Sequence, residues 1–279
     1  MTAVPRSEES QPLSRAARRA LRDGVPLSGT DTAPLLPFAV GGTWVLAILL
    51  TVGAYAEPLV LVGVNLLVGM VVAVGWPRLL GIAQPVATTV ILLLVALGAA
   101  AAGLVGDDPY LRWTPLVIAG GLVLTFGWQL ARRDGRLGLT GSVAATLFGV
   151  AVITLGTVLN PLARTLHGTD VVAVTMASIA VGALADLLTG RPRFHVWMLP
   201  AAMLLGGWAA AAASLFLGNP APGQGLLVGV LAAAVSHASR RVLGVLPGAR
   251  TLLGQLTIAA SSVSLVAVVA YVLARIFVG

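Results

Sequence analysis

The 279-residue sequence contains no cysteine and no lysine. Without cysteine, the chain cannot form a disulfide, a thiolate metal site or a cysteine nucleophile. Without lysine, it cannot carry out any step that requires a lysine amine, such as Schiff-base chemistry. All seventeen of its cations are therefore arginines.

Charge of either sign is also scarce. Only 10% of the residues are charged, 58% are hydrophobic, and the mean hydropathy is +0.97. Soluble domains carry about a quarter charged residues, so this composition excludes an ordinary soluble protein. Apolar blocks about 20 residues long follow one another along the chain, and blocks of this length are typical of helices that cross a bilayer. The composition predicts an all-α, polytopic integral membrane helical bundle.

The chain divides into two predicted regions. Residues 1–34 form a polar, basic, proline-containing tail, for which we expect disorder, and residues 35–279 form a transmembrane helical domain. Nine transmembrane helices are predicted in that domain, at residues 36–54, 58–75, 86–105, 114–131, 141–159, 171–188, 196–217, 224–239 and 254–277.

The arginines predict how these helices are oriented. If the N-terminal tail is cytoplasmic, fourteen arginines fall on the cytoplasmic side, and only Arg112, Arg164 and Arg275 fall on the other side. Loops on the cytoplasmic side of membrane proteins carry such an excess of cations. We therefore expect the N-terminus inside and the C-terminus outside. The same placement accounts for the basic pI, because arginines in cytoplasmic loops face anionic lipid. Nucleic acid is therefore not an expected partner.

The tryptophans give a weaker indication of depth. Trp76, Trp128 and Trp197 fall near the predicted cytoplasmic boundary, where aromatic rings often lie at the interface. Trp44 and Trp208 fall deeper in their spans, and we expect them to pack between helices.

The main ionisable residue inside a predicted span is Asp186. Such residues are costly in a bilayer and often mark functional sites. However, Asp186 is predicted to lie close to the cytoplasmic headgroups. An interfacial ion pair with Arg191 or Arg193 is therefore the simpler hypothesis, and a carboxylate that binds substrate or metal is the alternative.

A second candidate polar site contains His237, Arg240, Arg241 and, beyond a Pro-Gly turn, Arg250. Clustered arginines can bind phosphate, because the guanidinium fork matches phosphate oxygens. The simpler hypothesis is a basic helix end that anchors the protein at the cytoplasmic surface. No metal site, cofactor site or catalytic arrangement is recognisable in the spacing of the histidines, acids and glycines.

The stretch Arg240-Arg241-Val242-Leu243-Gly244-Val245-Leu246-Pro247-Gly248 resembles the signature of phosphatidate cytidylyltransferases. In that family a Lys-Arg pair precedes Gly-Val, followed by Lys-Asp, Pro-Gly-His-Gly-Gly and Asp-Arg. Ala185-Asp186 with Gly190-Arg191 resembles an earlier helix end of the family. The resemblance extends over residues 140–275 and implies a multi-span protein of phospholipid metabolism.

The chain departs from the family signature at the residues that catalysis requires. Leu246-Pro247 replaces the Lys-Asp pair, Ala249-Arg250-Thr251 replaces His-Gly-Gly, and no Asp-Arg follows. Cytidylyl transfer requires metal-held phosphates and therefore several carboxylates. The resemblance consequently implies a non-catalytic descendant. The composition, rich in alanine, valine and leucine, also resembles that of multi-pass membrane proteins of actinobacteria.

Three functions follow as expectations. The first is a permease-like or accessory protein of the bacterial inner membrane that is not an enzyme. The second is an inactive relative of phosphatidate cytidylyltransferase. The third is a structural partner of a membrane complex, which would present small residues on an exposed, peripheral helix. Membrane lipids are expected partners in each case, and the third function would add other membrane proteins.

Overall fold

A computed structural model describes residues 37–82, 85–105, 111–131, 139–190 and 196–277. The predicted tail, residues 1–34, lies outside these ranges. The described residues contain no β-strand, and they form nine helices that are long and apolar enough to cross a membrane. The chain is therefore a multi-pass, all-α membrane protein, as the composition predicts. The orientation of its ends stays a prediction.

The helices match the predicted spans closely. The long helices are α2 (Pro37–Ala56), α3 (Pro58–Leu79), α4 (Pro85–Val105), α5 (Thr114–Ala131), α6 (Leu139–Gly156), α8 (Gly168–Gly182), α9 (Met198–Leu217), α10 (Pro222–Leu243) and α11 (Leu252–Phe277). Two short elements complete the set: α7 (Leu159–Leu162) and the 3₁₀ helix η1 (Ala183–Gly190).

Proline and glycine fix several helix boundaries. Pro58 and Pro222 occupy the first turn of their helices, where a missing backbone N–H costs no hydrogen bond. Gly218 follows α9 with a φ of 82°, a left-handed conformation that glycine adopts without strain. These residues explain why the predicted boundaries are accurate at most turns.

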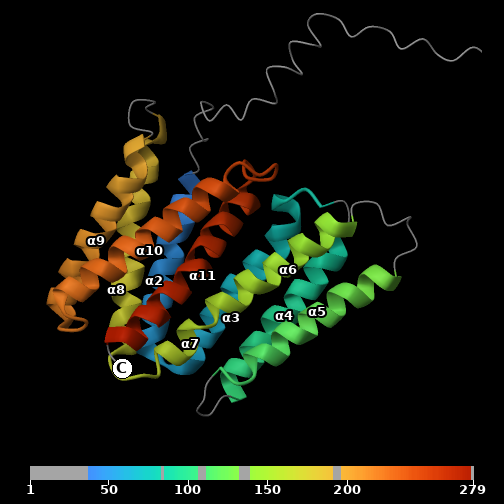
Figure 1. Ribbon diagram of the computed structural model, residues 1–279, viewed down its shortest axis with the longest axis horizontal. Helices are drawn as coiled ribbons and strands as arrows, with labels where there is room; N and C mark the ends of the chain where they lie inside the picture. Colours follow the sequence, from blue (N-terminus) through green and yellow to red (C-terminus); the bar gives the residue numbers. More distant parts are fainter. Residues whose placement is uncertain (1–36, 83–84, 106–110, 132–138, 191–195, 278–279) are drawn as a thin grey trace, which may run out of the picture. The chain divides into compact units, whose positions relative to one another are not determined.

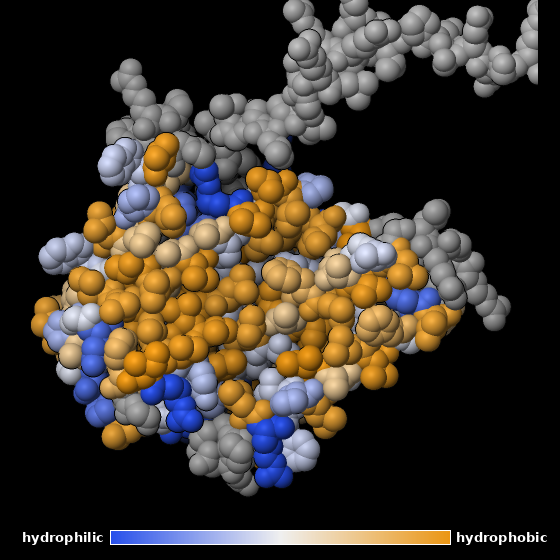
Figure 2. All heavy atoms as spheres, in the orientation of Figure 1, coloured by the Kyte–Doolittle hydropathy of each residue, from blue (hydrophilic) through white to orange (hydrophobic). Residues whose placement is uncertain are grey.

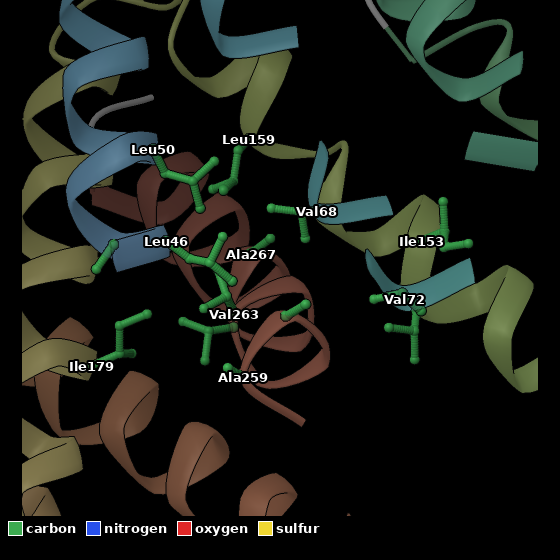
Figure 3. Close-up of a cluster of buried hydrophobic side chains, with 14 of the residues drawn as sticks. Leu46, Leu50, Val68, Val72, Ile153, Leu159, Ile179, Ala259, Val263 and Ala267 are labelled. Carbon is green, nitrogen blue, oxygen red and sulfur yellow. The ribbon is translucent and has the colours of Figure 1, made fainter. Parts of the chain in front are cut away.

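The central element of the bundle is α11. Helices α3, α4, α5 and α6 gather on one side of it, and α2, α8, α9 and α10 gather on the other (Figure 1). Figure 3 shows Ala259, Val263 and Ala267 of α11 facing Leu46 and Leu50 of α2 and aliphatic side chains of α3, α6 and α8. Small residues on α11 let its neighbours approach closely, which is how helices associate in lipid.

The exterior of the described bundle is apolar. Figure 2 shows a broad hydrophobic band on the visible face, with hydrophilic residues at its two edges. Trp44 and Trp208 are 41% and 70% exposed, so the expectation that they pack between helices is wrong. Trp76 is buried instead, and its Nε1 donates to the Ala145 carbonyl at 2.8 Å. Depth along a span does not determine which face of a helix a side chain occupies.

Helix α5 is the most peripheral span and contacts mainly α4 and α6. Gly120 and Gly127 lie on its exposed side, with no atom within 4 Å of where a Cβ would be. A groove of about 860 Å³, lined by apolar residues, lies between α4 and α5. This is the kind of exposed small-residue face that the structural-partner hypothesis expects, and that hypothesis stays a prediction.

Candidate functional site

Asp186 lies in η1, at the point where α8 has tightened into a 3₁₀ helix. The tightening begins at Ala183, after the last α-helical residue, Gly182. Helices commonly end in a 3₁₀ turn, which satisfies some of their last carbonyl groups. Because η1 contacts α9, α2 and α10 as well as α8, its side chains can meet residues far away in the sequence.

Four side chains form what we call the Asp186 cluster: Asp186, Ser236, His237 and Arg240. Asp186 Oδ1 lies 2.6 Å from His237 Nδ1, and Arg240 Nε donates to Asp186 Oδ2 at 2.6 Å. Arg240 Nη1 donates to Ser236 Oγ at 2.5 Å. The residues of α10 share one face because they are three and four positions apart.

The cluster is almost closed to its surroundings. The side chains of Arg240 and His237 are 3% and 5% exposed, and that of Asp186 is 17% exposed. A buried ion pair is costly to desolvate unless hydrogen bonds satisfy both partners. Here each carboxylate oxygen of Asp186 has a partner on α10, which holds η1 against that helix.

The geometry also fixes the proton on His237. An ionised carboxylate can only accept hydrogen bonds, so Nδ1 carries the proton that is donated to Asp186. In the neutral ring, Nε2 is then the basic nitrogen. The cluster has no net charge with His237 neutral and a charge of +1 with His237 protonated.

The two sequence-predicted constellations thus meet at Asp186, His237 and Arg240. Arg191 and Arg193, the expected ion-pair partners of Asp186, lie outside the described residues. Neither Arg241 nor Arg250 takes part in the hydrogen bonds given above. Arg241 Nη1 lies 3.4 Å from Met198 Sδ on α9, and Arg250 is in the turn after α10.

A second polar group, which we call the Asn160 cluster, lies at the opposite end of the bundle. Asn65 Nδ2 donates to Asn160 Oδ1 at 2.6 Å, and both residues are buried. Arg164 Nη2 donates to the Gly103 carbonyl at 3.0 Å. That carbonyl belongs to the last turn of α4, where carbonyls lack helical partners and a cation is favourable.

The sequence does not predict this second cluster. Asn160 precedes Pro161 and resembles an ordinary turn residue, and Asn65 is a single amide in an apolar span. The structure pairs them because α6 is interrupted after Gly156 and continues as α7, which keeps Asn160 inside the bundle. A buried amide in one span is a signal that a second amide should be sought, but the sequence does not say where.

Two hydroxyl groups of α11, those of Thr257 and Ser262, donate to carbonyls of their own helix. Thr257 Oγ1 donates to the Leu253 carbonyl at 2.7 Å, as expected for a hydroxyl on a buried helix face. Thr257 also packs against Gly75, where a Cβ would overlap its oxygen. The hydroxyl face therefore allows close contact between α11 and α3.

The described residues contain no group of three histidine, cysteine, aspartate or glutamate side chains that could hold a metal ion. Asp186 is the single carboxylate of its cluster, and His237 and Arg240 occupy its two oxygens. This donor set does not fit the metal-held phosphates that cytidylyl transfer requires.

No protein-family model, curated protein or solved structure matches the chain.

Proposed function

We propose that the protein is a permease-like component of the bacterial inner membrane, with the Asp186 cluster as its working centre. The observation that carries this proposal is the sharing of the Asp186 carboxylate between His237 and Arg240, at 2.6 Å each. Ionisable groups are rare within spans and typically belong to substrate or proton pathways. With these three residues in direct contact, a proton can pass between the aspartate and the histidine, and the carboxylate can change its ionic partner.

Two interruptions of the helices accompany the polar clusters. The chain leaves regular α-helix at Gly156, before α7, and at Ala183, where η1 begins. Freed backbone groups at such points create polar surroundings, although transporters have them near the bilayer midplane and the two interruptions here lie at the ends of their spans. Here the Asp186 cluster adjoins one interruption and the Asn160 cluster adjoins the other.

Profiling the metabolites and lipids of a deletion strain, followed by complementation, tests this function. We expect small polar metabolites to change in distribution between cells and medium. Wild-type protein should restore the distribution, and the Asp186→Asn variant should not. Asp170→Asn is the matched control, because it removes a carboxylate from the opposite end of the same span. Full rescue by Asp186→Asn would refute the proposal.

A second candidate is an inactive relative of phosphatidate cytidylyltransferase that takes part in phospholipid metabolism. It is favoured by the contact between Asp186 and Arg240, because these residues come from the two segments that carry the family resemblance. This candidate predicts altered phospholipid composition in the deletion strain, with polar metabolites unchanged. The purified protein should show no cytidylyl transfer with Mg²⁺, and measurable transfer would contradict this candidate.

A further inference from the structure

One nitrogen of the buried Arg240 guanidinium has no hydrogen-bond partner among the described residues. Nε donates to Asp186 and Nη1 donates to Ser236, but Nη2 is buried without an acceptor. Buried polar groups are nearly always satisfied, and an exception calls for an explanation such as a bound water, ion or ligand. What Nη2 lacks is an acceptor, and an oxyanion is the acceptor that best matches a guanidinium.

The charges of the cluster restrict how such an acceptor could bind. Within the four described side chains of the cluster, Asp186 and Arg240 neutralise each other, and His237 adds no charge when it is neutral. A bound monoanion would therefore leave one uncompensated negative charge in a site that is largely removed from water. Burying an unpaired charge is strongly unfavourable, so a proton should enter with the anion.

The neighbouring helices offer few other charges. On α10 the further cation is Arg241, beside Met198 of α9. The only acid in α8 is Asp170, which pairs with Tyr55 of α2 at the opposite end of the bundle. Neither α9 nor α2 carries a charged residue, and the charged residue of α11 is Arg275 in its last turn. Among the described residues, the Asp186–His237 contact is the place where a proton that enters with the anion can be held.

We propose that Arg240 binds a small oxyanion, a carboxylate or a phosphate group, and that the Asp186–His237 pair takes up one proton for each monoanion bound. No covalent bond changes: the anion accepts from Arg240 Nη2, and the proton neutralises the charge that the anion brings. The 17% exposed side chain of Asp186 marks the side from which the cluster can be reached. This inference rests on the proposed function and specifies the class of its substrate.

Acetate is the cleanest probe, because it is a monoanion throughout the neutral pH range, and inorganic phosphate is the second probe. The full chain in phosphatidylcholine nanodiscs would be titrated by calorimetry in buffers that differ in ionisation enthalpy, which reports the protons exchanged. We expect saturable binding with uptake of about one proton per acetate. Saturable binding with no proton uptake would overturn the proposal, and so would no saturable binding of either probe.

The variants separate the site from general surface charge. Arg240→Gln should weaken acetate binding by at least about tenfold, since a charged hydrogen bond is lost. His237→Gln should weaken binding and reduce the proton uptake, which a purely structural role of His237 would not do. Arg78→Gln is the control: Arg78 is an exposed arginine of α3 that bonds to its own helix, and binding should stay unchanged. If Arg240→Gln does not fold, as judged by gel filtration and circular dichroism, His237→Gln decides the outcome.

A comparison of two nanodisc lipids identifies the source of the oxyanion. If the natural ligand is a headgroup, nanodiscs containing phosphatidylglycerol should compete with acetate at the same site. If the ligand is a free solute, acetate binding should be the same in both lipids. Either result supports an oxyanion site, provided that Arg240→Gln abolishes the effect. Insensitivity to Arg240→Gln overturns the proposal.

These measurements can fail separately from the proposed function. Proton-linked acetate binding without any change in the metabolite profile would support the oxyanion site and contradict the permease-like role. Conversely, a metabolite profile that depends on Asp186, combined with no saturable binding of acetate or phosphate, would support the permease-like role and contradict the oxyanion site.

Discussion

The Asp186 cluster and the Asn160 cluster are the two polar centres at opposite ends of the described bundle, and they differ in charge. The first joins η1 to α10 through a carboxylate, an imidazole and a guanidinium. The second joins α3 to α7 through two neutral amides and uses Arg164 to cap α4. Only the first contains a histidine in contact with a carboxylate, groups that can exchange a proton, whereas the two amides of the second cannot.

This difference suggests different roles. Amide pairs between membrane helices are modest stabilisers, since the alternative partners in the membrane are nearly as good. A buried ion pair is a poor way to stabilise a fold, because desolvation offsets much of the attraction. The Asn160 cluster is therefore understandable as packing, and the Asp186 cluster calls for a functional explanation.

The largest expected effect is that of Arg240→Met. This change leaves the Asp186 carboxylate buried with His237 as its main partner and should lower the free energy of unfolding by about 3–5 kcal/mol. Unfolding by SDS in mixed micelles, followed by tryptophan fluorescence, would measure the loss. The double variant Asp186→Asn/Arg240→Met should recover part of the lost free energy, because it also removes the buried carboxylate charge. A loss below about 1 kcal/mol would mean that the ion pair is exposed to water in the membrane.

Ser236→Ala should have the next largest effect. It removes the acceptor of Arg240 Nη1 and leaves two guanidinium nitrogens without partners, so a loss of about 1–3 kcal/mol is expected. Ser239→Ala is the matched control, since the Ser239 hydroxyl donates to a carbonyl of its own helix. The same SDS titration applies. Equal losses for both serine variants would show that Ser236 does not position Arg240.

The sequence predicted the two clusters unequally, for physical reasons. Ionisable residues in spans attract attention because they are costly, so Asp186, His237 and Arg240 stand out from the residue types and their positions alone. The resemblance to cytidylyltransferases predicts that Asp186 meets Arg240 and Arg241. The residue types alone do not, because residues 186 and 240 are far apart in the chain and nearby arginines are the simpler partners of Asp186. A neutral amide in a span is less costly than a charge and is therefore a weaker signal. Asn160 resembles a turn residue in the sequence, and only the structure shows that α7 continues the path of α6.

The same reasoning explains where the predicted helix boundaries failed. Six spans end within three residues of their predicted positions, because apolar length and Pro or Gly punctuation define them. Helix α3 continues to Leu79, past the predicted end at 75, and α8 gives way to η1 at Ala183, before the predicted end at 188. The span predicted at 224–239 was cut short at its polar residues, whereas α10 runs from Pro222 to Leu243. It can continue as a helix because Asp186 compensates Arg240 and accepts from His237 inside the bundle.

Asn65→Ala tests the amide pair of the Asn160 cluster, with a smaller expected effect. It removes the amide that donates to Asn160 Oδ1, and the unfolding free energy should fall by about 1 kcal/mol. The loss should be the same at about pH 6 and pH 8, because neither asparagine titrates in that range. Unfolding titrations at both pH values provide the measurement. A loss that changes with pH would show that the Asn160 cluster is coupled to an ionisable group, and the contrast between the two centres would fail.

Gly103→Ala should have the smallest effect and tests how tightly the Asn160 cluster is packed. The added Cβ would lie 3.1 Å from Asn160 Nδ2 and 3.3 Å from a methyl carbon of Val62. These contacts are tight but need shifts of only a few tenths of an ångström, so we expect a loss of about 0.5–1 kcal/mol in the same SDS titration. Gly120→Ala on the exposed face of α5 is the control, since nothing lies near its added Cβ. If Gly103→Ala is as harmless as Gly120→Ala, the Asn65–Asn160 pair has room to move, and the Asn160 cluster loses its explanation as packing.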